Sequence, residues 1–168
     1  MTTALLLIDV QNNMLLPPEP VPDAAAVGPA IRDILDRARE RGAIVVHIRN
    51  TGGSGDPDEP DTPGWELVHE VRSGEFVVDK DHSDAFQETD LADFIPPAAP
   101  LVLVGMQSEY CVRATALAAL SRNHPVTLVH GAHSTYPGDE PAQETSRQVE
   151  EELLKAGAKI VDPEDVEF

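Results

Sequence analysis

Three side chains that could perform nucleophilic and acid–base chemistry each stand at the end of an apolar run. Asp9 follows one run, Lys80 ends a second, and Cys111, the only cysteine, follows a third through a short turn. In an open parallel sheet, ligands bind beyond the carboxyl ends of the strands. If these runs are parallel strands, Asp9, Lys80 and Cys111 lie at the same edge of the sheet.

Together these residue types supply the parts of a cysteine hydrolase. A thiol has an ordinary pKa of about 8.5, and a lysine or the N-terminus of a helix favours its thiolate. The sequence predicts that Cys111 begins a helix, so both influences can act on it. A carboxylate such as Asp9 can take the thiol proton and later deliver it to a leaving amine. Backbone amides of residues 106–111 can stabilise an oxyanion.

Each of the three residues also has an ordinary structural explanation. A lone cysteine is usually a small buried hydrophobe, and Asp9 can cap a turn or a helix. Lys80 stands between Asp79 and Asp81 and can be a surface ion-pair residue. Spacing alone does not decide between these roles and catalysis.

The pattern of apolar residues predicts the elements that must position the three side chains. Runs rich in Val, Ile and Leu are typical of buried parallel strands and occur at 4–8, 43–48, 76–80, 101–104, 126–129 and 158–161. Segments with helical spacing lie between them, at 24–41, 111–123 and 140–156. This alternation predicts an α/β fold with a parallel sheet covered by helices on both faces.

Two segments rich in proline, glycine or acidic residues interrupt this pattern, at 16–22 and 51–64. Both are expected to be loops, the second a surface loop or a lid over the site. The length of 168 residues suits one domain over 1–168.

Composition narrows the choice of partners. A formal net charge of −18 would repel nucleic acids and anionic lipid surfaces, so we expect neither as a partner. No apolar run approaches the roughly 18–20 residues that a membrane span needs, and the first residues lack the basic segment of a secretory signal. A single cysteine forms no internal disulfide, which agrees with an expected cytoplasmic location.

Several motifs, in the observed order along the chain, resemble the isochorismatase-like cysteine hydrolase superfamily. Residues 5–14 resemble the family's opening strand with its catalytic aspartate, and residues 80–86 resemble the segment with its catalytic lysine. Residues 105–116 resemble its glycine-to-cysteine turn and the following helix. Residues 130–134 stand where the family has an Asp-Ala-x-Ser-like segment.

The resemblance implies a single-domain three-layer α/β/α fold and a catalytic triad of Asp9, Lys80 and Cys111. It also implies a non-proline cis peptide, which by position is Met106–Gln107, and an oxyanion hole formed by the amides of Gln107 and Cys111. The family commonly forms homo-oligomers, so a dimer or tetramer whose chains help to close the pocket is expected.

Departures from the family pattern bear on metal binding. Nicotinamidases of the family hold a metal through an Asp-x-His motif, whereas the corresponding region here reads His47-Ile-Arg-Asn50. The aspartate is missing, and His82, His130 and His133 show no metal-ligand spacing. We therefore expect no metal and no other cofactor.

Retention of Cys111 favours hydrolysis of a small molecule's amide, carbamoyl or ureido C–N bond through a thioester. Two alternatives stay open: an isochorismatase-type vinyl-ether hydrolase, which needs no cysteine nucleophile, and a catalytically silent member that binds a small molecule or a partner protein. Substrate contacts expected by position are Gln11, Asn13, Trp65 and Tyr110, with Arg49 or Arg113 as partners for a substrate carboxylate.

Overall fold

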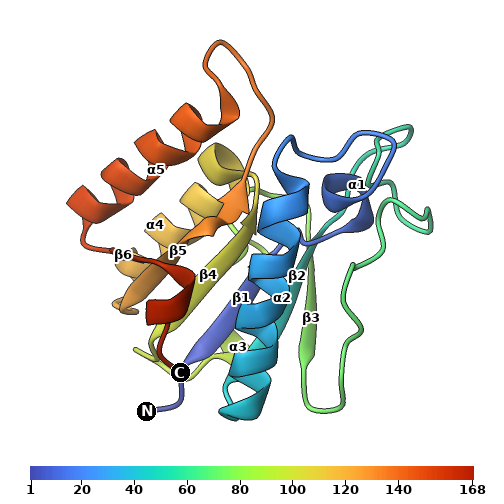
Figure 1. Ribbon diagram of the computed structural model, residues 1–168. Coiled ribbons are helices and arrows are strands. Elements are labelled where there is room, and N and C mark those ends of the chain that lie inside the picture. The colour runs from blue at the N-terminus through green and yellow to red at the C-terminus, as the bar shows by residue number, and fades with distance from the viewer.

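The computed structural model describes residues 1–168, and its centre is a six-stranded sheet in the order β3-β2-β1-β4-β5-β6. All neighbouring strands pair in parallel. The strands are β1 (Ala4–Ile8), β2 (Ile44–Asn50), β3 (Phe76–Lys80), β4 (Leu101–Met106), β5 (Val126–Ser134) and β6 (Lys159–Val161). Every run expected to be a strand is one, and the predicted α/β/α fold is confirmed (Figure 1).

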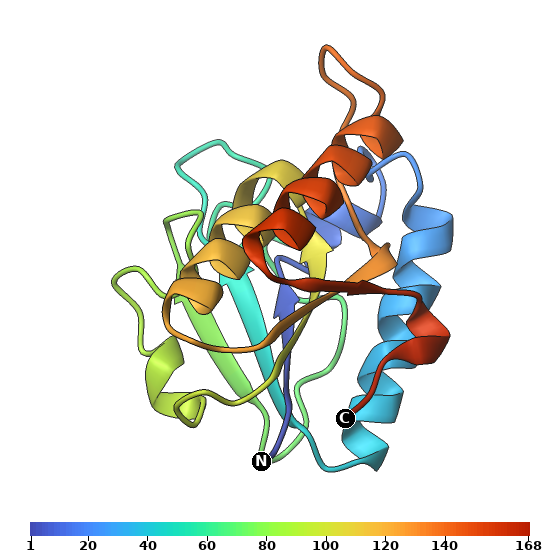
Figure 2. The same cartoon turned by 90° about the vertical axis from the view of Figure 1, so that its left-hand side faces the viewer.

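Helices cover both faces of this sheet, as Figure 2 shows for α2 and α4, which lie on opposite sides of the strands. One face is covered by α1 (Asn12–Leu15), α2 (Ala24–Glu40) and the segment around the C-terminal turn Pro163–Asp165. The other face is covered by α3 (Leu91–Phe94), α4 (Arg113–Ser121) and α5 (Ala142–Ala156). None of these helices is long and apolar enough to cross a membrane.

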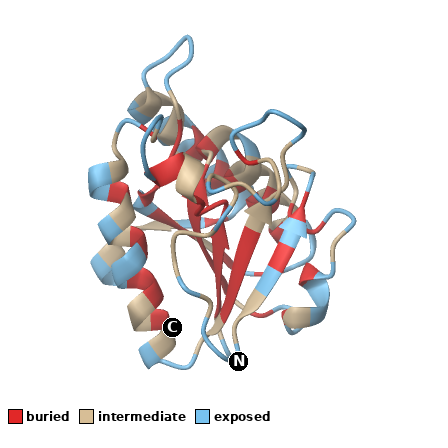
Figure 3. Ribbon diagram, turned by 90° about the vertical axis from the view of Figure 1, so that its right-hand side faces the viewer, coloured by how far each residue is buried: buried red, intermediate tan, exposed pale blue.

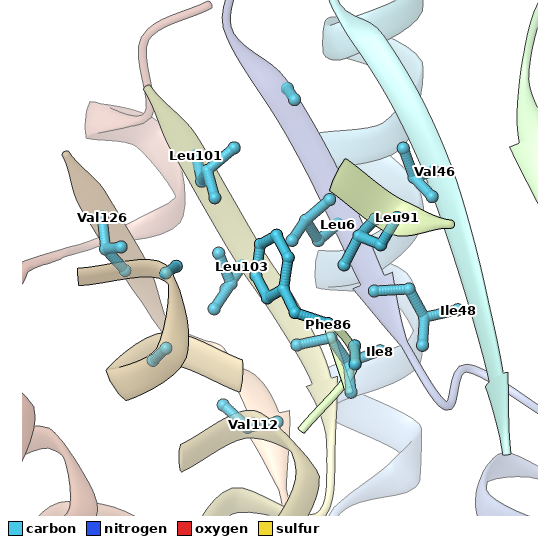
Figure 4. Packing of buried hydrophobic residues seen from close by; sticks show 14 of the residues in the cluster. Leu6, Ile8, Val46, Ile48, Phe86, Leu91, Leu101, Leu103, Val112 and Val126 are labelled. Carbon is cyan, nitrogen blue, oxygen red and sulfur yellow. The ribbon is translucent and has the colours of Figure 1, made fainter. Parts of the chain in front are cut away.

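The central strand β1 contributes to both hydrophobic cores because successive side chains of a strand point to opposite faces. Leu5 and Leu7 pack into the core beneath α2, whereas Leu6 and Ile8 pack into the opposite core with Phe86 (Figure 4). The central strands are buried along their length, as Figure 3 shows. Burial of each large aliphatic side chain stabilises the fold by roughly 1.5–3 kcal/mol, so the end of β1 is a firm anchor for Asp9.

The structure corrects the expected start of the helix at Cys111. A π-helical turn, Ser108–Val112, precedes α4, and Cys111 is the fourth residue of this turn. We call Ser108–Val112 the cysteine turn. Strands β4 and β5 also run past their apolar runs, since pairing between them continues to Met106 and Ser134.

The two expected loops lie beside the carboxyl ends of β1 and β2. Loop 51–64 is tied to α1, because Asn13 N donates to Gly64 O at 3.0 Å and the Asn12 side chain donates to Pro63 O at 3.0 Å. Gly64 packs so tightly that a Cβ there would lie 2.0 Å from Pro57 O. Loop 51–64 is thus packed against α1 in this structure.

Candidate active site

The side chains of Asp9, Lys80 and Cys111 meet at the carboxyl edge of the sheet. Lys80 Nζ lies 3.2 Å from Asp9 Oδ2 and 3.2 Å from Cys111 Sγ. Its third contact is Asn50 Oδ1 at 2.9 Å, so each of the three ammonium protons has an acceptor. The Lys80 and Asp9 side chains are almost completely buried. The structure therefore brings together the three residues that the sequence placed after separate strands.

Close contact between β1 and β4 fixes the position of Asp9. Asp9 has a φ of 51°, in the left-handed region that aspartate tolerates better than most residues. Next to it on β4, Gly105 has a φ of 124°, and a Cβ there would lie 1.9 Å from the Ile8 carbonyl oxygen. Only glycine lets the two backbones approach so closely at this point.

Burial and neighbouring charges set the protonation of the site. Burial raises the pKa of Asp9, and the Lys80 ammonium opposes this rise. Burial also raises the pKa of Cys111 to about 12; the Asp9 carboxylate adds to the shift and Lys80 opposes it. Cys111 therefore rests as a thiol. Burial of the sulfur and the charge of Asp9 thus oppose the influence of Lys80, which was expected to favour the thiolate.

The cysteine turn is preceded by a backbone amide that is free to bind a ligand. The Met106–Gln107 peptide bond is cis, and the Gln107 N–H donates to no group of the chain. The N–H groups of Tyr110 and Val112 both donate to Gln107 O, at 3.2 Å each. Gln107 and Cys111 line the same cavity, where an unpaired amide can stabilise developing negative charge.

A cavity of about 820 Å³ opens onto Cys111, a size typical of small-molecule sites. Its walls come from α1, from the two loops 16–22 and 51–64, and from segments that follow β3, β4 and β5. Asn13 and Tyr110, two of the four expected substrate contacts, line it. Its carboxylates besides Asp9 are Glu19, Asp56, Asp58 and Asp81.

The structure assigns Gln11 a different position from the expected one. Gln11 is fully buried and does not line the cavity. Its side chain accepts from Asn50 N at 2.8 Å and donates to Asn50 O at 3.1 Å and to Trp65 O at 2.9 Å. The expectation that Gln11 contacts substrate is wrong, because the side-chain amide of Gln11 makes its hydrogen bonds to β2 and to Trp65, next to loop 51–64.

Trp65 and the two arginines also lie away from the cavity lining. The Arg49 guanidinium stacks on the Trp65 ring at 3.4 Å and binds Asp79 at 2.6 and 3.0 Å. Arg113 pairs with Glu152 at 2.7 and 2.6 Å. Both guanidinium groups are thus paired with carboxylates outside the cavity, and the structure does not place Trp65, Arg49 or Arg113 where a substrate contact was expected.

Sequence reasoning missed the pair Asn50 and Asp58. Asn50 accepts from Lys80 and donates from Nδ2 to Asp58 Oδ2 at 2.6 Å. Asp58 is only 8% exposed although it belongs to loop 51–64. No periodic pattern marks one aspartate in a segment rich in acidic residues, so this role becomes visible only once the loop is folded.

A buried hydrogen-bonded chain supports the cysteine turn from the side of β5 and α5. Ser108 Oγ lies 2.7 Å from His133 Nδ1 and 3.0 Å from Ser146 Oγ. His133 Nε2 in turn lies 2.9 Å from Glu150 Oε1. Ser108 is fully buried, so its hydroxyl does not serve as a second nucleophile. These hydrogen bonds instead hold the cysteine turn in place. From the sequence, His133 was excluded as a metal ligand and was given no supporting role.

The chain matches the family model for the Isochorismatase domain over residues 3–165. It is 48% identical to a streptothricin hydrolase of Streptomyces noursei over 137 residues, which are 79% of this chain and 54% of that protein. The chain spans about half the length of the two curated streptothricin hydrolases it matches.

Two solved structures share the fold. The zinc complex of Pyrococcus horikoshii pyrazinamidase superposes with a TM-score of 0.82 at 27% identity, covering 96% of this chain and 99% of that one. The N-carbamoylsarcosine amidase of Thermoplasma acidophilum superposes with a TM-score of 0.83 at 23% identity and full coverage of both chains.

The side chains at the end of β2 do not offer a set of free ligands for a metal ion. Asn50 already binds Lys80 and Asp58, and His47 is buried against Glu75 with Nε2 at 2.9 Å from the carboxylate. Asp81, His82 and Glu88 do bring potential metal-ligating atoms close together. Asp81 and Glu88 are exposed, and His82 is half-buried. No step of the chemistry below is assigned to a metal.

Proposed function

The chain belongs to the isochorismatase family, and from this premise we propose that it hydrolyses a C–N bond of a small molecule with Cys111 as the nucleophile. The bond is of the amide, carbamoyl or ureido class. The observation that carries the proposal is the contact of one buried ammonium, Lys80, with both Asp9 and Cys111. The similarity to a streptothricin hydrolase and to a pyrazinamidase supports a hydrolytic activity.

The first half of the reaction forms a thioester. The substrate carbonyl lies against the amides of Gln107 and Cys111, and Asp9 takes the thiol proton as Sγ attacks the carbonyl carbon. The two amides stabilise the negative charge that develops on oxygen. Asp9 then gives its proton to the nitrogen as the C–N bond breaks, and ammonia or an amine leaves.

The second half uses the same groups in the reverse sense. Asp9 takes a proton from water, which attacks the thioester carbonyl, and the same amides stabilise the second oxyanion. Collapse releases the acid, and the proton returns to Cys111 sulfur. The Lys80 ammonium keeps Asp9 and Cys111 in contact. Asn13 is proposed to bind the substrate because its buried Oδ1 has no partner in the chain.

A screen for ammonia release from small primary amides, carbamoyl amines and ureido acids tests this function. We expect turnover of at least one class by the native chain, and loss by at least about 10³-fold in Cys111→Ala and in Asp9→Ala. Ser121→Ala, on the exposed end of α4, is the matched control and should keep full activity. Turnover that survives in Cys111→Ala would instead favour vinyl-ether hydrolysis, and a native chain inactive on every class would favour a binding role.

A further inference from the structure

The catalytic centre holds more negative than positive charge. Asp9 and Asp58 are both buried, together with the single ammonium of Lys80. Burial is the main cause that raises the pKa of Asp9, and the negative charge of Asp58 adds to it. Two carboxylates therefore share one cation in a region where an uncompensated charge is costly.

Asp58 has one carboxylate oxygen without a partner. Its Oδ2 accepts from Asn50, whereas its Oδ1 accepts no hydrogen bond from the chain. The residue is more than nine-tenths buried and lines the cavity. Gly52 provides the space for it, since a Cβ at position 52 would lie 2.1 Å from Asp58 Oδ1.

The rest of the cavity has the same sign of charge. Glu19, Asp56 and Asp81 line it, and no arginine or lysine does. Neither Glu19, Asp56 nor Asp58 forms an ion pair with a basic side chain. The only titratable base in the lining is His82, which contacts Asp81 at 3.5 Å and Glu88 at 3.0 Å.

We propose that the cavity selects substrates that carry a positive charge near the scissile bond, and that Asp58 Oδ1 binds this charge. The inference rests on the proposed function, because it names the substrate class of the same site. An ammonium or guanidinium group of the substrate supplies the missing cation, and Glu19 and Asp56 attract it toward the cavity. Asp58 is thus a specificity-determining residue as well as a support for Asn50.

Charged thiol reagents test the potential at Cys111 without knowledge of the substrate. Cys111 is the only cysteine, so modification of the full chain reports on this site alone. Cationic 2-aminoethyl methanethiosulfonate and anionic 2-sulfonatoethyl methanethiosulfonate both form a mixed disulfide with a thiolate. Both reagents attack the same thiolate, so the ratio of their rates does not depend on the pKa of Cys111, and dividing it by the ratio for free mercaptoethanol removes the difference in intrinsic reactivity between the two reagents.

We expect a normalised cation-to-anion ratio of at least about 10 at low ionic strength, which falls as salt is added. Asp58→Asn, which keeps an acceptor for Asn50, should lower the ratio at least about threefold. The matched control Asp93→Asn removes one charge from α3, at the opposite end of the sheet from α1 (Figure 1), and should leave the ratio unchanged. A native ratio near 1, which no folding defect can explain, would overturn the proposal.

Turnover separates this proposal from the proposed function. The probes are 4-aminobutanamide and pentanamide, which differ by an ammonium in place of a methyl group. We expect a higher kcat/KM for the cation, and a selective rise in its KM in Asp58→Asn. Hydrolysis of amides without charge preference would overturn the charge selection alone. A cation preference in labelling, without hydrolysis of any amide, carbamoyl amine or ureido acid, would overturn the proposed function alone.

Discussion

Cys111 shares its surroundings with one carboxylate and one ammonium, and the balance among burial and these charges decides where its proton lies. Burial raises the pKa of the thiol to about 12, and Asp9 adds to this while Lys80 opposes it. The sulfur of Cys111 therefore rests as a thiol. Because the thiolate is the form that oxidises readily, the resting thiol is also protected from oxidation.

Replacement of Asp9 by Asn is expected to lower the pKa of Cys111, because Lys80 then acts without an opposing charge. Thiolate absorbance in an ultraviolet pH titration should appear about one pH unit lower than in the native chain. Turnover should nevertheless be lost, since no group remains to move the proton. Cys111→Ser supplies the background titration. An unchanged or higher thiol pKa in Asp9→Asn would contradict this account of the site.

The sequence could name Asp9, Lys80 and Cys111 because each stands where an apolar run ends, and parallel strands end at a common edge. The sequence could not show where a side chain points. Gln11 was therefore expected in the pocket, although its side chain lies in the protein interior. The role of Asp58 depends on how loop 51–64 folds back onto β2, and nothing local in that loop encodes it.

At the level of elements, the cysteine turn depends on what lies behind it. Ser108, His133 and Glu150 connect the turn to β5 and α5 through one buried and one partly buried hydrogen bond. The sequence placed residues 106–111 in a tight turn and began the helix at Cys111, because five residues are too few to reveal a π-helical spacing. Helices α1 and α3, with four residues each, escaped prediction for the same reason.

His133→Leu is expected to loosen the cysteine turn. It leaves Ser108 and Glu150 without their shared partner, which should lower the unfolding free energy by about 2 kcal/mol. Displacement of the nucleophile and of the Gln107 amide should reduce kcat more than it raises KM. Urea unfolding and steady-state kinetics measure the two effects.

His130→Leu is the matched control for this variant. His130 also binds Glu150 Oε1, at 2.8 Å, but its side chain is 61% exposed, against 1% for His133. We expect it to cost less than about 1 kcal/mol and to leave kcat unchanged. Equal effects of the two substitutions would show that the buried hydrogen bonds of His133 are not what holds the cysteine turn.

At the scale of the whole molecule, stability in acid depends on a second charge cluster, which is formed by Arg39 of α2, His47 of β2 and Glu75, the residue directly before β3. Although burial opposes it, hydrogen bonds from Arg39, the Arg72 amide and His47 lower the pKa of Glu75 from its ordinary 4.5 to about 2. Burial lowers the pKa of His47, and Glu75 opposes that shift. In both cases the unfolded chain binds more protons, so stability falls as the pH falls.

Glu75→Gln should therefore lower the unfolding free energy at neutral pH by about 2 kcal/mol. The contribution of Glu75 is fully present above its ordinary pKa of 4.5 and is lost toward about 2, so the native chain and the variant should converge over that range. Thermal or urea unfolding at several pH values measures this. Glu144→Gln removes an exposed carboxylate that pairs with Arg147 and should change stability little; a constant gap for Glu75→Gln would contradict the linkage.

The fold class could be predicted because strands buried on both faces show as continuous apolar runs, such as the one that forms β1. The strand order and the two four-residue helices depend on contacts between distant segments, which no local pattern contains. A homo-oligomer stays a prediction.

The strand order has a consequence for refolding. Lys80 comes from the edge strand β3, whereas Asp9 and Cys111 follow the adjacent strands β1 and β4, and 71 and 31 residues separate Lys80 from its two partners. A chain that has recovered its helices but has not yet docked β3 holds the nucleophile without its ammonium. The rate at which turnover returns would therefore report the docking of the edge strand β3. Circular dichroism, by contrast, reports secondary structure averaged over the whole chain.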